Sequence, residues 1–323
     1  MIVSGLMMTN IPTLVDLFFA HSGRLVDKWE QYLSVYEQEL GSLAAAGKPL
    51  RLLEVGVQNG GSLELWADFL PTGSTIIGLD IDPRIGELAF DNPGISALVA
   101  DATDSAAIDR ALGDRRFDII IDDGSHLCRD VRATFELLYP RLALGGRFII
   151  EDLHCSYYQS HGGSLSGPNS SIEFLKGLVD ALNADHLPEG SGPVEEVDRL
   201  RAYNRTVARV SFFDSVAVIE KLPHAKDRHY RRIISGEKGD VQSFGDWIGY
   251  APLPHLRMLL LGEPAAKQFE KDAIKLIENA RRDALAAVAE ANQHIADLTV
   301  EVEQLTIALS AYAVPSARVE SQD

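Results

Sequence analysis

Two of the predicted strands, the fourth and fifth along the chain, end in acidic residues. Asp123 follows the fourth strand, and Glu151 and Asp152 follow the fifth. In a doubly wound sheet these strands are parallel neighbours, so we expect the three carboxylates to converge at one edge. Crowded carboxylates repel one another, and a divalent cation relieves that repulsion. Oxygen ligands favour a hard metal, Mg²⁺ by default. The alternative is that these residues cap helices or pair with Arg129 and Arg147.

Two histidines accompany these carboxylates. His126 follows Asp123 by three residues, in a turn where its imidazole can face the same cleft. Imidazole exchanges protons near neutral pH, which suits a general base. His154 is the competing candidate for the base, and it could instead ligate the metal or contact the substrate.

The turn after the first predicted strand is rich in glycine and indicates a ligand site. Glycine lets a backbone approach a ligand closely, with a helix N-terminus behind it. The turn lacks the G-x-G-x-x-G spacing of a dinucleotide pyrophosphate site, and its carboxylate disfavours an anion. The sulfonium and ammonium groups of S-adenosylmethionine would suit it. The candidate cofactor-binding residues here are Glu54, Gly56, Asn59, Gly60 and Ser62.

Acidic residues also end the second, third and fourth strands. Asp80, at the end of the second, can accept hydrogen bonds from both ribose hydroxyls. Asp101 follows the third strand, where it can meet an adenine amine, and Asp122 joins this cofactor-binding set. Each residue could instead cap a following helix, which is the commoner role of a single Asp. Three such residues in succession favour a nucleoside ligand.

Short apolar runs position these side chains. Each run is too short for a core helix and shows little polar alternation, which is typical of buried parallel strands. Helical stretches separate them, so the pattern predicts right-handed βαβ units in a doubly wound α/β sheet. The predicted strands are residues 50–57, 74–81, 95–100, 117–123 and 146–153.

The flanking segments have different patterns. Residues 12–46 are expected to be helical and to end at Gly47 and Pro49. Residues 155–200, rich in Gly and Ser near their start, predict a surface loop or a mobile lid where the acceptor is selected. Two β-rich runs, 206–213 and 216–222, predict a hairpin that closes the sheet with an antiparallel strand.

Residues 263–312 carry a heptad pattern that predicts a coiled coil and a homo-oligomer, with a single amphipathic helix as the alternative. We therefore divide the chain into an N-terminal helical region (1–48), an α/β domain (49–222), a helical extension (223–262), the coiled coil and a disordered tail (313–323). One seam holds Ile274, Arg281, Val288, Ile295, Val302 and Leu309, and the other holds Ile277, Ala284, Ala291, Leu298, Leu305 and Tyr312.

Composition narrows the class of protein. The 323 residues include 47 acidic side chains against 30 Lys and Arg, a net charge of −17. This excess argues against nucleic acid as a partner. Two cysteines, Cys128 and Cys155, build no disulfide framework and favour a reducing cytoplasmic location. No segment reaches about 18 uninterrupted apolar residues, so we expect no integral membrane segment.

Five strings resemble the macrocin O-methyltransferase family, which includes mycinamicin and rhamnosyl sugar O-methyltransferases and cephalosporin hydroxylase-like relatives. They are LLEVGVQNGGSLELW, GLDIDP, FDIIIDDGSH, FIIEDLHCSYY and FFDSVAVIEK, within residues 25–222. The resemblance implies a Rossmann-like class I methyltransferase fold with a mostly parallel seven-stranded sheet, S-adenosylmethionine as donor and Mg²⁺ at the acceptor site. It also implies that Asp123, Glu151 and Asp152 hold the metal and that His126 is the base.

The sequence thus predicts an S-adenosylmethionine-dependent, Mg²⁺-assisted O-methyltransferase. Its expected acceptor is a sugar hydroxyl of a glycosylated natural product, a glycolipid or a polysaccharide. A metal-dependent oxygenase that uses His126, His154 and a carboxylate is one alternative. A non-catalytic S-adenosylmethionine-binding scaffold assembled through the coiled coil is the other.

Overall fold

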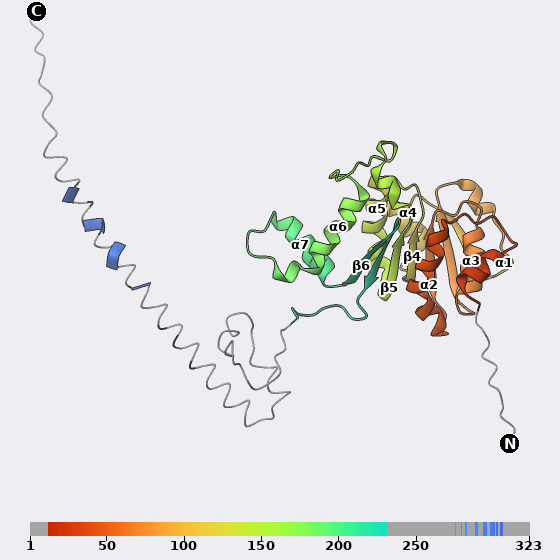
Figure 1. Cartoon of the computed structure of the whole chain (residues 1–323), viewed down its shortest axis with the longest axis horizontal. Coiled ribbons are helices and arrows are strands. Elements are labelled where there is room, and N and C mark those ends of the chain that lie inside the picture. The colour runs from red at the N-terminus through yellow and green to blue at the C-terminus, as the bar shows by residue number, and fades with distance from the viewer. Residues whose placement is uncertain are drawn as a thin grey trace, which may run out of the picture. The chain divides into compact units, whose positions relative to one another are not determined.

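The computed structural model describes residues 12–230 and scattered helical positions between 275 and 305. The chain divides into two compact units, residues 1–229 and 230–323. The first unit contains one seven-stranded sheet with the strand order β3-β2-β1-β4-β5-β7-β6 (Figure 1). Its strands are β1 Arg51–Val55, β2 Thr75–Asp80, β3 Ile95–Val99, β4 Phe117–Asp122, β5 Leu142–Ile150, β6 Val207–Phe213 and β7 Val216–Lys221.

Strand direction agrees with the sequence pattern. The neighbours β1–β2, β1–β4, β2–β3 and β4–β5 are parallel, whereas β7 is antiparallel to both β5 and β6. The hairpin turns at Asp214 and Ser215, and Ser215 has a φ of 65°. The mostly parallel, doubly wound sheet and its closing hairpin are therefore confirmed.

Helices cover both faces of the sheet because the buried strands present apolar side chains to each. The α-helices are α1 Leu14–Ala20, α2 Glu30–Ala45, α3 Gly61–Phe69, α4 Ser105–Leu112, α5 Cys128–Leu138, α6 Ser171–Leu182 and α7 Val194–Asn204. Short 3-10 helices are η1 Pro83–Glu87, η2 Tyr139–Arg141, η3 Leu153–Tyr157, η4 Gln159–His161 and η5 Ala184–His186.

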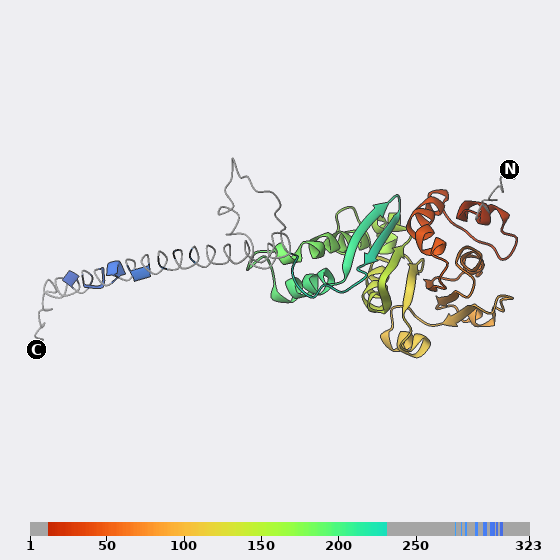
Figure 2. The same ribbon diagram turned by 90° about the horizontal axis from the view of Figure 1, so that it is seen from below.

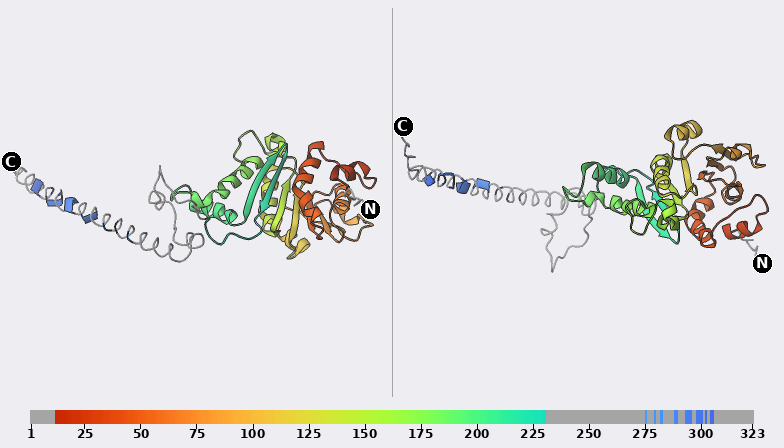
Figure 3. Two further views of the ribbon diagram at one scale, coloured as in Figure 1. Left: turned by 60° about the horizontal axis from the view of Figure 1, so that its bottom comes forward. Right: turned by 90° about the horizontal axis from the view of Figure 1, so that it is seen from above.

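Two apolar cores lie on opposite faces of the sheet. The consecutive β1 residues Leu52 and Leu53 lie in different cores. Side chains of α1, α2 and α3 pack in one core, and side chains of α4, α5 and α6 pack in the other. Figures 2 and 3 show the strands between these two layers of helices. The N-terminal helices therefore share a core with the α/β domain.

Two expectations about the flanking segments are wrong. Residues 12–46 form α1 and α2 separated by the non-helical segment 21–29, rather than one helical stretch. Trp29 is the N-cap of α2 instead of a mid-helix residue. Much of 155–200 is helical, because α6 buries Leu175 and Leu178 in the core. The segment that begins at Ser160 does include the expected non-helical, glycine-rich stretch.

The C-terminal expectations fall largely outside the described residues, which include neither the helical extension 223–262 beyond Tyr230 nor the tail 313–323. Of the heptad positions described, Val288, Ile295, Leu298, Val302 and Leu305 are helical and exposed. Among the described residues, no helix combines the length and apolar character that crossing a bilayer requires.

Candidate active site at the carboxyl edge of the sheet

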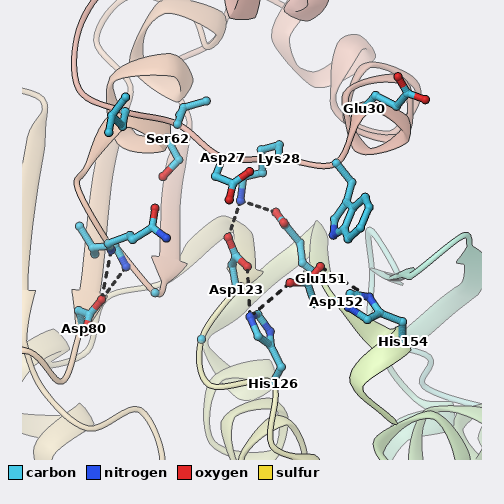
Figure 4. A pocket seen from close by; sticks show the side chains of 17 residues that line it. Asp27, Lys28, Glu30, Ser62, Asp80, Asp123, His126, Glu151, Asp152 and His154 are labelled. Carbon is cyan, nitrogen blue, oxygen red and sulfur yellow. Dashed lines mark hydrogen bonds and ion pairs between the residues drawn. The ribbon is translucent and has the colours of Figure 1, made fainter. Parts of the chain in front are cut away.

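The ends of β1, β4 and β5 bring the central acidic residues together. β4 lies between β1 and β5, and Asp122 is in register with both Val55 and Ile150. The strands are therefore parallel neighbours, as expected. Glu54 in β1, Asp123 after β4 and Glu151 after β5 surround one ammonium group at this edge, and Figure 4 shows Asp123 and Glu151 pointing toward it.

Lys28, which the sequence analysis did not select, lies among these three carboxylates. Its Nζ donates hydrogen bonds to Asp123 Oδ2 at 2.5 Å and Glu151 Oε1 at 2.8 Å. Glu54 Oε1 is 3.7 Å from the same nitrogen. The Lys28 side chain is only 2% exposed. One buried ammonium therefore provides part of the positive charge that the sequence assigned to a metal.

Burial and charge compete at this cluster. Burial alone would lower the pKa of Lys28, but Glu151, Asp123 and Glu54 outweigh it and hold that pKa well above its usual range. Burial raises the pKa of Glu151, although Lys28 opposes the shift. Tyr36 is buried and donates its hydroxyl hydrogen to Glu151 Oε1. Glu151 is thus held on one oxygen by both Lys28 and Tyr36.

A second group of atoms, which could act as metal ligands, lies beside the carboxylates that surround Lys28. Asp123, His126 and Asp152 each offer an atom within 4.8 Å of the others. His126 Nε2 is 3.4 Å from Asp152 Oδ2 and 3.9 Å from Asp123 Oδ1. Tyr32 donates to Asp152 Oδ1 at 2.6 Å, which fixes that carboxylate. His126 and Asp152 both adopt positive φ, 54° and 55°.

This donor set fits a divalent cation. Two carboxylates and one imidazole at the mouth of a cavity are suitable ligands for Mg²⁺ or Mn²⁺. Glu151 lies next to this set but its Oε1 is engaged by Lys28. The arginines offered as alternative partners lie elsewhere: Arg129 pairs with Asp130, and Arg147 pairs with Glu220 and Glu39.

His154 is oriented by a different set of contacts. Its Nδ1 is 2.6 Å from Ser215 Oγ and 3.9 Å from Asp152 Oδ1. Its ring makes an edge contact with Trp29 at 5.8 Å between centroids. One ring nitrogen is thus engaged by the hairpin turn, whereas His126 Nε2 faces the two carboxylates directly.

A cavity of about 880 Å³ opens onto both groups of residues. Its wall includes the segment from Leu25 to Glu30 together with Gly56, Gln58, Ser62, Asp80, Asp123, His126, Glu151, Asp152 and His154 (Figure 4). A neighbouring cavity of about 440 Å³ shares Gly56, Asp80, Gly124 and His126 and extends to Asp101 and Asp122. None of the residues described in 155–200 lines either cavity.

Gly56 in the glycine-rich turn is required by close packing of the protein's own backbone. Gly56 has a φ of 89°, and a Cβ there would lie 2.0 Å from the Asp123 carbonyl oxygen. Glu54 accepts a hydrogen bond from Ser62 Oγ at 2.7 Å. Its Oε1 is buried without a hydrogen-bond partner, and the cation beside it is the Lys28 ammonium at 3.7 Å.

Three further acidic residues lie around the smaller cavity. Asp80 Oδ2 accepts the Val57 backbone N–H at 2.8 Å and so supports the glycine-rich turn. Asp101 accepts from the backbone and side chain of Thr103 in the loop before α4, whose N-cap is Asp104 rather than Asp101. Burial raises the pKa of Asp122 to about 7, and its Oδ2 has no hydrogen-bond partner.

Three candidate cofactor residues, Glu54, Asn59 and Gly60, line neither cavity. Gly60 is instead the N-cap of α3, with a φ of 83°. Gln58, in the same turn, lines the larger cavity. The sequence carried no signal for Lys28, because it is one of several charged residues in the RLVDKWEQY stretch. Trp29 was identified only as a helical apolar position.

Comparison with known proteins agrees with this arrangement. A family model described as a methyltransferase domain matches residues 53–153. The rhamnosyl tetracenomycin-C 2'-O-methyltransferase of Streptomyces olivaceus is 32% identical over 225 residues, 66% of this chain and 55% of that protein. Demethylmacrocin O-methyltransferase of Streptomyces fradiae is 35% identical, over 53% of this chain and 44% of that protein.

A solved structure shares the fold. The MycE methyltransferase in complex with Mg, SAH and mycinamycin VI has a TM-score of 0.55 and 29% identity, over 67% of this chain and 54% of that one. The chain thus spans about half the length of the relatives it matches. By its sheet order, its strand-end motifs and these similarities, the chain carries a class I methyltransferase domain similar to the macrocin and mycinamicin O-methyltransferases.

Proposed function

We propose that the protein is an S-adenosylmethionine-dependent, Mg²⁺-assisted O-methyltransferase of a sugar hydroxyl. The acceptor would be a glycosylated natural product, a glycolipid or a polysaccharide. The observation that carries the proposal is the placement of Asp123, His126 and Asp152 beside a cavity that continues to Gly56 and Asp80. The names of the relatives, which describe methylation of sugar hydroxyls, support the acceptor class.

The donor is proposed to bind across the glycine-rich turn. Gly56 and Asp80 line the larger cavity, and Asp80 lies where a carboxylate can accept ribose hydroxyls. Asp122 lines the smaller cavity with an unpartnered Oδ2, which suits a polar nucleoside group, and Glu54 remains a predicted contributor. Asn59, Gly60, Ser62 and Asp101 remain predicted contributors.

The acceptor is proposed to bind on the His126 side of the cavity. A hydroxyl oxygen attacks the methyl carbon in line with the sulfonium, the carbon–sulfur bond breaks, and its electrons remain on sulfur. His126 Nε2 receives the hydroxyl proton, and Asp152 Oδ2 at 3.4 Å stabilises the resulting imidazolium. Positioning of this kind supplies on the order of 7–11 kcal/mol in favourable systems.

Asp123 and Asp152 are proposed to hold Mg²⁺, with Glu151 as the third ligand expected from the sequence. When bound, the cation would orient the acceptor hydroxyl and increase its acidity. Tyr32 supports the site by holding Asp152, and Tyr36 supports it by holding Glu151. An oxygenase is less well supported, because the described cluster contains one histidine and two carboxylates.

The rim of the cavity suggests how the acceptor enters. Trp29 is 55% exposed and contacts the His154 ring, which in turn contacts Tyr158 at 5.7 Å between centroids. An aromatic surface of this kind suits the apolar face of a sugar or its aglycone. We therefore propose that the acceptor passes Trp29 before its hydroxyl reaches His126.

A homo-oligomer through residues 263–312 is part of the proposal. The exposed helical residues Ile295, Leu298 and Leu305 occupy heptad positions, which supports pairing with a second chain. Light scattering should show a dimer or larger assembly for the full chain. A Leu298→Asp, Leu305→Asp double variant should be a monomer, and an unchanged mass would contradict the proposal.

The test of activity is methyl transfer itself. Purified full-length protein should add one methylene unit per product molecule when given S-adenosylmethionine and a panel of glycosides, read by mass spectrometry. EDTA should remove this activity and Mg²⁺ should restore it. Activity indifferent to EDTA would eliminate the metal, and tight donor binding without product on any glycoside would favour a scaffold.

A further inference from the structure

The position of Lys28 has a consequence for metal binding. Its ammonium contacts Asp123 Oδ2 and Glu151 Oε1, with Glu54 as a third carboxylate neighbour at 3.7 Å. These carboxylates come from the ends of three adjacent strands. The ammonium therefore lies in the position that the sequence pattern assigned to a divalent cation.

The two cations share two carboxylates, Asp123 and Glu151. A metal bound only to Asp123 Oδ1 and Asp152 Oδ2 uses atoms that Lys28 does not contact. To gain Glu151 as a ligand, however, it must approach the carboxylate whose Oε1 is hydrogen-bonded to Lys28. An ammonium and a divalent cation repel each other strongly at such short range in a water-poor site. Both cannot remain in contact with Glu151 and Asp123.

We propose that Lys28 is a tethered competitor of the divalent cation. It neutralises the buried carboxylates when metal is absent, and it must be displaced when metal gains Glu151 as a ligand. Lys28 thereby lowers the metal affinity of the site while keeping the metal-free protein folded. The inference rests on the proposed function, because that function supplies the metal.

The segment that carries Lys28 packs on α3 at its start and leads directly into α2. Arg24 forms an ion pair with Glu64 of α3 at 2.5 Å, and a Cβ on Gly61 would lie 2.3 Å from the Leu25 carbonyl oxygen. This end of the segment therefore packs tightly on α3. Lys28 and Trp29 lie beyond it and line the cavity. Displacement of Lys28 should thus change the surroundings of Trp29.

The primary experiment compares metal binding in the wild type and Lys28→Met. Methionine retains most of the side-chain volume without the charge. Mn²⁺ serves as a paramagnetic probe, titrated into the full-length protein and read by electron paramagnetic resonance. The variant should bind Mn²⁺ at least 10-fold more tightly than the wild type. Equal or weaker binding by Lys28→Met would overturn the inference.

Thermal melting gives a readout independent of activity. In EDTA, Lys28→Met should melt below the wild type, because three carboxylates lose their buried counter-charge. Saturating Mn²⁺ should raise the melting temperature of the variant more than that of the wild type. Lys226→Met is the matched control, since Lys226 is also buried and pairs with Asp185 away from this site. It should leave Mn²⁺ affinity unchanged.

A second substitution tests whether the metal enters the position of Lys28. Glu151→Gln keeps the side-chain shape but removes the charge, and it should weaken Mn²⁺ binding at least 10-fold in the wild-type and Lys28→Met backgrounds. Unchanged affinity would mean that the metal never displaces Lys28, which overturns the inference alone. Absence of Mn²⁺ binding in both the wild type and Lys28→Met would overturn the inference and the metal part of the proposed function together.

Tryptophan fluorescence provides the conformational readout. Mn²⁺, or Mg²⁺ to avoid paramagnetic quenching, should shift the emission of Trp29 in the wild type, and Trp29→Phe should abolish the shift. The shift should shrink in Lys28→Met, which has no ammonium to displace. A full shift in that variant would contradict the displacement of Lys28 as its cause.

Discussion

Replacing His126 is the sharpest test of the proposed chemistry, and asparagine is the appropriate substitute. His126 has a φ of 54°, a left-handed conformation that Asn tolerates better than most residues. Alanine would add roughly 1–2 kcal/mol of backbone strain. The imidazole is 22% exposed and pairs only at 3.4 and 3.9 Å. We therefore expect His126→Asn to change the free energy of unfolding by less than about 1 kcal/mol.

The expected kinetic loss follows from the role of a general base. Removal of such a group lowers kcat by about 10²–10⁴-fold, which corresponds to roughly 3–5 kcal/mol in the activation free energy. The affinity for S-adenosylhomocysteine, measured by calorimetry, should stay within about 3-fold of wild type, because the donor is proposed to bind at Gly56 and Asp80. Turnover is measured by mass spectrometry at saturating donor and acceptor.

The matched control is His154→Asn, since His154 lies beside the same carboxylates but is held by Ser215. It should lower kcat by less than 10-fold. If His154→Asn causes the greater loss, the base is misassigned. If His126→Asn weakens Mn²⁺ binding at least 10-fold, His126 is a metal ligand, and the reasoning from the 3.4 Å contact with Asp152 is refuted.

Three further predictions concern the donor site, the rim and the core. Asp80→Asn should weaken S-adenosylhomocysteine binding about 10–100-fold, because the charged acceptor of the Val57 N–H is lost. Unchanged affinity, measured by calorimetry, would exclude Asp80 from the donor site. Trp29→Ala should raise the acceptor KM while donor affinity stays constant, and a loss of donor affinity instead would argue against an acceptor rim. Burial lowers the pKa of Lys221 from 10.5 to about 8. The free-energy penalty of burying its charge is therefore fully present below pH 8, and it is lost above pH 10.5, where the amine is neutral in both the folded and the unfolded protein. In urea denaturation, the effect of Lys221→Met on the free energy of unfolding should therefore be more stabilising at pH 7 than at pH 10.5, by up to about 3 kcal/mol. An effect that does not depend on pH would contradict the lowered pKa of Lys221.

The sequence alone was sufficient for the sheet and for the edge that carries the site. Short apolar runs with little polar alternation became β1 to β5, since strands buried on both faces expose no periodic polar side. The connection of only Asp214 and Ser215 fixed the β6–β7 hairpin, because so short a link allows only antiparallel pairing. Parallel strands present their carboxyl ends at one edge, which is why Asp123 and Asp152 could be placed near each other.

Local pattern failed where packing decided the outcome. The apolar spacing of Leu25 and Trp29 fits a helix, yet residues 21–29 are non-helical and anchored through Arg24 and Glu64. Similarly, the glycine-rich start of 155–200 concealed α6, which is stabilised by burying its apolar face against α5 and the sheet. Tertiary contacts of this kind outweigh weak local preferences.

Only the tertiary structure identified the counter-ion of the site. Lys28 lies 95 residues from Asp123 and 123 from Glu151 along the chain. No local period links them, since their contact depends on how the segment before α2 crosses the ends of three strands. The types and order of residues determined which carboxylates would converge. The fold decided how they are neutralised, because the electrostatic energy of a buried charge depends on distances in space rather than on separation along the chain.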